Sequence, residues 1–202
     1  MNPENTNSLL VSSGDNCVIF DAWGRSDDWD NLLNSRGLKL QAIYATHGHG
    51  DHISAAPELA RRHNVPWFLK NEDIPLISWK REMLDFWNLP RIAEDFIPPQ
   101  DLQIGRVKIL NDIDMEIIAS PGHSRGGVMF YFPEYKILLS GDTIFHDGVG
   151  RTDLPGGDEK ILRESIANLM VRNLPDDTYV VHGHGDDSMI GTLKKYNPYF
   201  IA

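Results

Sequence analysis

The sequence is poor in cysteine, in long apolar runs and in basic residues, and each shortage excludes a class of protein. Cys17 is the single cysteine among 202 residues, so no disulfide can form within the chain, and its apolar neighbours predict a buried thiol in a strand. No apolar run approaches the ~20 residues that cross a bilayer, and residues 1–5 lack the basic and apolar regions of a signal peptide. We therefore expect a cytoplasmic protein with no membrane partner.

Acidic residues outnumber basic ones. The chain holds 29 Asp and Glu against 19 Lys and Arg, which gives a formal net charge of −10. Because a phosphate backbone binds to basic patches, this composition argues against a nucleic-acid partner. The hydrophobic fraction of 41% and the charged fraction of 24% are those of a globular protein, and we expect one domain over residues 1–202.

Strand and helix patterns alternate along the chain, which predicts an α/β domain. The expected strands cover residues 9–11, 17–20, 40–45, 65–69, 107–110, 114–119, 128–132, 136–140 and 178–181. Helices are expected from a cap at Ser26 to Gly37, over 53–63, after a cap at Asp158 with Leu162, Ile166, Leu169 and Met170 buried, and over 189–195. The spacing of these elements leaves one long irregular stretch.

That stretch, residues 71–99, holds a dense set of aliphatic and aromatic side chains and ends in proline-containing breaks. Two interpretations stay open. It could be a helical hairpin packed on the core, or a helical lid over a functional site that supplies apolar contacts to a substrate.

One segment concentrates the chemistry: Thr46-His47-Gly48-His49-Gly50-Asp51-His52 carries three imidazoles and a carboxylate directly after an expected strand. Neutral imidazole and carboxylate suit Zn²⁺, Fe²⁺ and Mn²⁺, so the segment predicts a metal site rather than a solvated loop. In an extended segment His47 and His49 point the same way, whereas Asp51 and His52 diverge as the chain enters a helix. Two ligand pairs aimed at neighbouring points suggest two metals.

Three further segments place potential ligands directly after strands. They are Ser120-Pro121-Gly122-His123, Gly141-Asp142-Thr143-Ile144-Phe145 and His182-Gly183-His184-Gly185. Each histidine or aspartate again stands beside glycine or close to one. Ligands that emerge at the ends of successive strands are what a metal centre at a sheet edge requires.

Together the motifs His-x-His-x-Asp-His, Pro-Gly-His-Ser, Gly-Asp-x-x-Phe and Gly-His-Gly resemble the metallo-β-lactamase superfamily, and within it the single-domain glyoxalase II-like hydrolases. The resemblance spans residues 47–185 and implies an αββα sandwich. It also implies two divalent metal ions, with zinc favoured and iron or manganese as alternatives. By motif position the first ion would be bound by His47, His49 and His123, the second by Asp51, His52 and His184, and Asp142 would bridge both.

The reaction that this resemblance implies is hydrolysis of a small-molecule thioester, of the hydroxyacylglutathione type, or of a related ester. Two divalent ions would lower the pKa of a shared water and hold it as a hydroxide that attacks the carbonyl carbon. Asp51 and Asp142 are the expected catalytic carboxylates, and Asp51 would orient the hydroxide.

Residues around the ligands have open roles. Arg151 could hold a substrate carboxylate or pair with Asp153, and His146 could contact substrate or form a pocket wall. His182 is expected at a strand end and not as a ligand, since the family motif places its ligand directly after glycine. Asp21 and Ser120 are expected partners of metal-bound histidines.

The sequence departs from two-domain glyoxalase II after His184. Only residues 185–202 follow, in place of a helical domain for glutathione, and Asp186 and Asp187 stand where that family has an aromatic residue. Recognition of glutathione therefore stays open. The alternatives are a persulfide dioxygenase with one Fe²⁺, a lactonase, and a metal-binding scaffold without activity.

Overall fold

The computed structural model describes residues 6–77 and 96–200 of the chain. The chain falls into two compact units, Asn2–Leu102 and Gln103–Ala202. They are called the N-terminal unit and the C-terminal unit below, and each is described by itself.

The N-terminal unit contains a five-stranded sheet in the order β1-β2-β3-β4-β5. The strands are β1 (Leu9–Ser13), β2 (Asn16–Phe20), β3 (Lys39–Tyr44), β4 (Trp67–Leu69) and β5 (Gln100–Asp101). Strands β1 and β2 form the predicted opening hairpin, and the remaining neighbours pair in parallel. Parallel pairing aligns the carboxyl ends of β2 and β3, where Asp21 and the histidine-rich segment begin.

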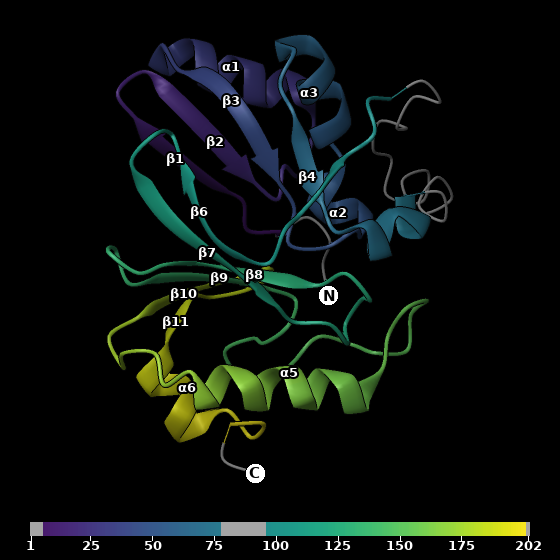
Figure 1. Cartoon of the computed structure of the whole chain (residues 1–202), viewed down its shortest axis with the longest axis vertical. Helices are drawn as coiled ribbons and strands as arrows, with labels where there is room; N and C mark the ends of the chain where they lie inside the picture. The colour runs from purple at the N-terminus through teal and green to yellow at the C-terminus, as the bar shows by residue number, and fades with distance from the viewer. Residues whose placement is uncertain (1–5, 78–95, 201–202) are drawn as a thin grey trace. The chain divides into compact units, whose positions relative to one another are not determined.

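Two helices, α1 (Ser26–Arg36) and α3 (Ala56–His63), lie along this sheet (Figure 1). Their apolar side chains bury the core with residues of β3 and β4, and Leu59, Ile43 and Trp67 are fully enclosed. The left-handed Gly37 ends α1 as predicted, with a φ of 63°. The predicted cap was wrong: the helix begins at Ser26, and the capping position is Arg25, which makes no side-chain cap bond.

The helix predicted over residues 53–63 is present but begins later, because α3 begins at Ala56 and Ile53 ends a separate short helix, α2 (Gly50–Ile53). The backbone N–H of Ala55 donates to the Ala22 carbonyl at 3.0 Å, and the Ser54 hydroxyl accepts from the N–H of Gly24 at 2.9 Å. The Ala55 N–H therefore bonds to a distant loop and not to a helical carbonyl, and the Ser54 side chain adds a second bond to that loop. Pro57 then suits the first turn of a new helix.

Part of the predicted lid lies inside the described residues. Asn71–Asp73 form a short 3₁₀ helix, η2, and residues 74–77 are helical. Ile77 packs into the core of the N-terminal unit. Residues 78–95 lie outside the described residues, so the choice between hairpin and lid stays a prediction.

The C-terminal unit contains a six-stranded sheet in the order β11-β10-β9-β8-β7-β6. Its strands are β6 (Gly105–Ile109), β7 (Ile113–Ala119), β8 (Val128–Phe132), β9 (Ile137–Gly141), β10 (Tyr179–His182) and β11 (Ser188–Met189). Neighbours are antiparallel except β9 and β10, which are parallel. The predicted hairpin of β8 and β9 is confirmed.

Helices α5 (Glu159–Val171) and α6 (Ile190–Tyr196) lie against the sheet of the C-terminal unit (Figure 1). Asp158 caps α5 as predicted, and its carboxylate accepts from the N–H of Ile161 at 3.0 Å. Leu162, Ile166 and Leu169 are buried, but Met170 is 37% exposed, contrary to the prediction. Met170 lies about 80° around the helix axis from Leu162, at the margin of the buried stripe.

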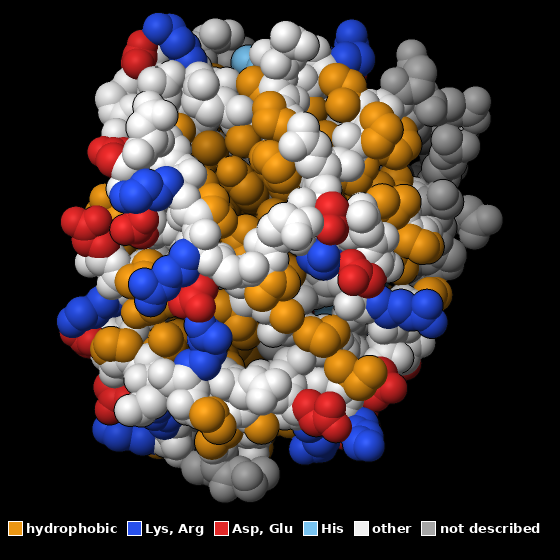
Figure 2. All heavy atoms as spheres, viewed as in Figure 1, with side chains coloured by type: hydrophobic (Ala, Val, Ile, Leu, Met, Phe, Trp, Pro, Cys, Tyr) orange, Lys and Arg blue, Asp and Glu red, His pale blue; other side chains and the backbone are white. Residues whose placement is uncertain are grey.

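None of the helices among the described residues is long and apolar enough to cross a membrane. On the face drawn in Figure 2, Lys and Arg side chains lie next to Asp and Glu side chains. Cys17 is buried in β2 as predicted, and burial raises the pKa of its thiol to about 11.

Candidate metal centre

The N-terminal unit presents four of the predicted ligands in one turn after β3. His47, His49, Asp51 and His52 are all buried. Nε2 of His47 lies 3.0 Å from Nδ1 of His49, and Nε2 of His52 lies 3.9 Å from an oxygen of Asp51. The sequence-predicted pairing of these four side chains is therefore present in the local structure.

Asp21 organises this turn. Its carboxylate accepts from the backbone N–H of Thr46 at 2.7 Å and from the Thr46 hydroxyl at 2.8 Å, and it lies 2.9 Å from Nδ1 of His52. The prediction that Asp21 holds a candidate ligand is confirmed. Because the carboxylate binds Nδ1–H, the lone pair of a neutral His52 is on Nε2.

The same reasoning gives the tautomer of His47. The Thr46 hydroxyl donates its only hydrogen to Asp21, and Nδ1 of His47 lies 3.1 Å from that hydroxyl oxygen. Nδ1 of His47 therefore donates, and Nε2 carries the lone pair. The ring centroids of His47 and His52 lie 4.2 Å apart. The two rings, each with the lone pair on Nε2, are therefore held close together in the buried turn.

Asp73 supports the turn and was missed from the sequence. Its carboxylate accepts from the backbone N–H of Gly48 at 2.8 Å. A Cβ at position 48 would lie 2.8 Å from the Cβ and carbonyl oxygen of Asp73, so only glycine fits between the two histidines. The partners are 25 residues apart, and nothing in the local pattern identified the contact.

The C-terminal unit brings together the other three predicted ligands. His123 follows β7, Asp142 follows β9 and His184 follows β10. One carboxylate oxygen, Oδ2 of Asp142, lies 3.5 Å from Nε2 of His123 and 3.6 Å from Nε2 of His184. A single carboxylate oxygen thus faces two imidazole nitrogens.

The loop after Asp142 orients His123. Nδ1 of His123 lies 2.7 Å from the carbonyl oxygen of Arg151, which can only accept, so Nδ1 carries the proton and Nε2 the lone pair. A Cβ at Gly150 would lie 1.9 Å from the Asp142 carbonyl oxygen and 2.8 Å from Nδ1 of His123. Gly150 is therefore the close approach that lets this loop reach the histidine.

Ser120 was predicted to hold a histidine, and that prediction is wrong. Its hydroxyl accepts from the hydroxyl of Thr143 at 2.9 Å, and within the described part of the chain it has no bond to a histidine ring. It fixes the turn that carries Asp142 instead.

His182 is buried at the end of β10 and is surrounded by polar groups of the C-terminal unit. Its Nδ1 lies 2.6 Å from the Ile144 carbonyl oxygen, and its Nε2 lies 2.7 Å from the Ser188 hydroxyl. Burial lowers the pKa of His182, which favours the neutral ring. Both ring nitrogens have protein partners, which agrees with the choice of His184 as the ligand.

Of the two proposed substrate contacts, Arg151 pairs with Asp153. The guanidinium donates from Nε and Nη2 to the two carboxylate oxygens, each at 2.7 Å, and both side chains are exposed. This pair lowers the pKa of Asp153 to about 2 and raises the pKa of Arg151. His146 is exposed.

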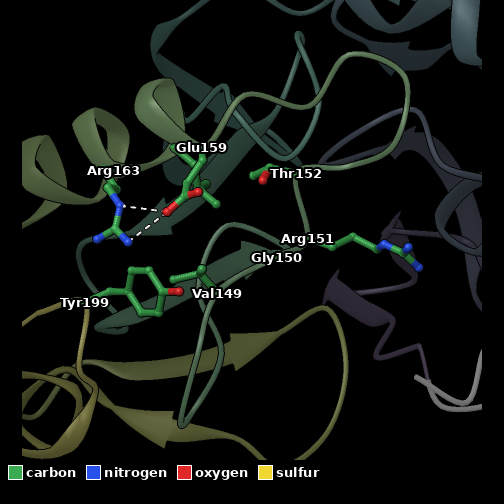
Figure 3. A pocket seen from close by; sticks show the side chains of 8 residues that line it. Val149, Gly150, Arg151, Thr152, Glu159, Arg163 and Tyr199 are labelled. Carbon is green, nitrogen blue, oxygen red and sulfur yellow. Dashed lines mark hydrogen bonds and ion pairs between the residues drawn. The ribbon is translucent and has the colours of Figure 1, made fainter.

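A cavity of about 260 Å³ lies in the C-terminal unit behind the Gly150–Arg151 backbone. Arg163 donates to Glu159 there and lies over the Tyr199 ring at 4.8 Å, while the Arg151 side chain points away (Figure 3). The cavity is lined by Val149, Gly150, Arg151, Thr152, Glu159, Leu162, Arg163 and Tyr199, and none of these is a predicted metal ligand.

The donor atoms fit metal ions. Two ligands bound to one Zn²⁺ at 2.0–2.1 Å with tetrahedral angles lie about 3.4 Å apart. The separations of 3.0 Å in the N-terminal unit and of 3.5 and 3.6 Å in the C-terminal unit are close to that value. All seven predicted ligands are among the side chains that could hold a metal ion.

Comparison with known proteins decides the family. A family model described as the metallo-beta-lactamase superfamily matches residues 1–184. The chain belongs to this superfamily. It is 32% identical over 200 residues to the probable metallo-hydrolase YqgX of Bacillus subtilis. That alignment covers 98% of this chain and 93% of YqgX. It is 33% identical over 194 residues to the hydroxyacylglutathione hydrolase GloC of Haemophilus influenzae, over 95% of this chain and 91% of that protein.

Solved structures of the superfamily confirm the predicted α/β fold class. BLEG-1 B3 metallo-beta-lactamase is 28% identical, with a TM-score of 0.84 over 98% of this chain and 95% of that chain. TTHA1623 in a di-iron-bound form is 32% identical, with a TM-score of 0.85 over 98% of this chain and 97% of that chain. The fold and the histidine and aspartate groups together indicate divalent metal ions.

Proposed function

We propose that this metallo-β-lactamase superfamily member is a dinuclear metal-dependent hydrolase that cleaves a thioester or a related ester of a small molecule. In this proposal His47, His49 and His123 bind one ion, Asp51, His52 and His184 bind the other, and Asp142 binds both. Zinc is the favoured metal, and the iron of TTHA1623 makes iron the first alternative.

The observation that carries the proposal is the position of one carboxylate oxygen. Oδ2 of Asp142 lies at nearly equal distances from the donor nitrogens of His123 and His184. In this assignment His123 binds the first ion and His184 the second, so one carboxylate oxygen lies close to a ligand of each ion. That position supports a bridging role for Asp142.

The chemistry divides between the ions and the chain. When bound, the two ions would activate a water molecule at neutral pH and stabilise the charge that develops on the substrate carbonyl oxygen. Asp51 would accept a hydrogen bond from the attacking water and aim it at the carbonyl carbon. The bonds from Asp21 to His52 and from His123 to the Arg151 carbonyl keep both rings in the ligating tautomer.

The substrate class rests on the relatives. GloC is named as a hydroxyacylglutathione hydrolase, and its match to this chain covers nearly its whole length. Arg151 would bind a substrate carboxylate through donors that Asp153 leaves available, or by exchange of that partner. His146 would contact the substrate beyond Asp142.

The test is a substrate screen on one metal-analysed preparation. We expect hydrolysis of S-lactoylglutathione or of simpler thioesters, without oxygen consumption. A preparation with a single iron per chain that consumes oxygen with glutathione persulfide would contradict the proposal and identify a persulfide dioxygenase. Hydrolysis confined to lactones would keep the metal mechanism and reject the thioester class.

A further inference from the structure

The side chain of His182 connects two turns of the C-terminal unit that carry candidate ligands. It is 1% exposed, and its partners Ser140 and Ser188 are also buried. Nδ1 lies 2.6 Å from the Ile144 carbonyl oxygen and 3.0 Å from the Ser140 hydroxyl, and Nε2 lies 2.7 Å from the Ser188 hydroxyl. Burial on this scale makes each of these bonds costly to lose.

The hydrogens of this network can be assigned. A carbonyl oxygen only accepts, so Nδ1 of His182 donates to Ile144, and in the neutral ring Nε2 accepts from the Ser188 hydroxyl. The Ser140 hydroxyl donates to the same Ile144 carbonyl at 3.0 Å. His182 is thus a bridge within the protein, with no nitrogen directed to a metal.

The bridge joins the segments of Asp142 and His184. Ile144 is two residues after Asp142 in the turn that ends β9. Ser188 begins β11, so its bond to His182 closes the loop of residues 183–187, which contains His184. The N–H of Gly183 also donates to the Gly141 carbonyl at 2.8 Å, directly before Asp142.

We propose that His182 is a positioning residue that holds the Asp142 carboxylate at bridging distance from the His184 imidazole, and so sets the affinity of the metal bound by His184. The proposal rests on the metal centre proposed above and adds a residue outside it. Loss of the bridge frees both turns to move, and an outer partner of this kind is worth about 10–100-fold in metal affinity.

The experiment compares four variants as full-length proteins, with cobalt as the probe. His182→Leu removes both nitrogens, and Ser188→Ala removes only the Nε2 partner. His182→Asn keeps an N–H near the position of Nδ1. His63→Asn is the matched control, because His63 ends α3 in the N-terminal unit and pairs with Asp30 of α1, and neither residue is a predicted ligand.

We expect His182→Leu and Ser188→Ala to weaken the binding of one of two Co²⁺ equivalents by about 10–100-fold and to shift its visible absorption spectrum. His182→Asn should recover part of that loss, and His63→Asn should match the wild type. Melting curves of the metal-free proteins identify any variant that fails to fold. If His182→Leu fails to fold, Ser188→Ala and His182→Asn decide the question.

Wild-type affinity and spectrum in the folded His182→Leu and Ser188→Ala variants would overturn the proposal, as would equal losses in His182→Asn and His182→Leu. These readouts do not depend on hydrolysis. A wild-type protein that binds two Co²⁺ but hydrolyses no ester or thioester would contradict the proposed reaction and leave the role of His182 to be judged from binding alone. A wild-type protein that binds no Co²⁺ would overturn both.

Discussion

At the scale of single residues, the predicted metal ligands depend on neighbouring residues that no larger residue can replace. The chain has a Gly-Val-Gly segment at 148–150, and only its second glycine is enclosed. A Cβ at Gly150 would overlap the Asp142 carbonyl oxygen and crowd His123, whereas a Cβ at Gly148 would meet nothing within 4 Å. The two positions therefore make a matched pair for experiment.

We expect Gly150→Ala to lower both metal content and hydrolysis by tenfold or more, because the loop must move away from His123 and takes the Arg151 carbonyl with it. Gly148→Ala should resemble the wild type. Metal content by mass spectrometry and initial rates under saturating metal are the measurements. Full metal content and full activity in Gly150→Ala would show that the close packing of this loop is unimportant to the centre.

Asp21→Asn tests the support of the predicted ligands in the N-terminal unit. The amide keeps the shape of Asp21 but loses the charge and one acceptor for the donors of Thr46 and His52, so metal affinity should fall about 10–100-fold. Asp15→Asn is the control, since the exposed Asp15 carboxylate pairs with Lys39 and not with a predicted ligand. Competition with a metal chelator measures the metal affinity. Equal metal affinities in the two variants would show that Asp21 does not support the metal centre.

At the scale of elements, the sequence predicted most strands and the ends that carry ligands. Apolar runs identified β2, β3, β7, β8 and β9, and glycine beside histidine or aspartate located the turns after them. The two-residue strands β5 and β11 have no periodicity to detect. The break between α2 and α3 and the roles of Asp73 and Ser120 depend on partners more than 20 residues away, which local patterns do not contain.

The surface of α3 gives a prediction on pH. Glu58 accepts hydrogen bonds from Arg61 and Arg62, which lower its pKa from 4.5 to about 2. A carboxyl with a lowered pKa stabilises the fold above its unfolded pKa, and this stability is lost as the pH falls from 4.5 to about 2. The pairs are partly exposed, so each contributes about 1 kcal/mol or less.

Glu58→Gln should therefore lose less stability than the wild type on acidification through that range, while Glu164→Gln, an exposed position on α5, should follow the wild type. Urea unfolding midpoints at a series of pH values measure the difference. Parallel curves for the wild type and Glu58→Gln would contradict the assigned role of the pairs.

At the scale of the whole molecule, a net charge of −10 and a set of buried histidines and aspartates favour a protein stabilised by cations. Metal that binds only the folded chain adds stability in proportion to the logarithm of its concentration, about 2.7 kcal/mol at 100 times the dissociation constant. Chelation should lower the melting temperature, and added Zn²⁺ should restore it. A melting temperature that is the same in both conditions would mean that metal binding and folding are not coupled.

The central claim is that Asp142 joins two metal ions in one centre. Titration of the metal-free protein with Zn²⁺, read by calorimetry and by mass spectrometry of the native protein, tests it most directly. The account predicts two equivalents per chain for the wild type and the loss of at least one in Asp142→Ala. One equivalent in the wild type, or two undiminished equivalents in Asp142→Ala, would contradict it.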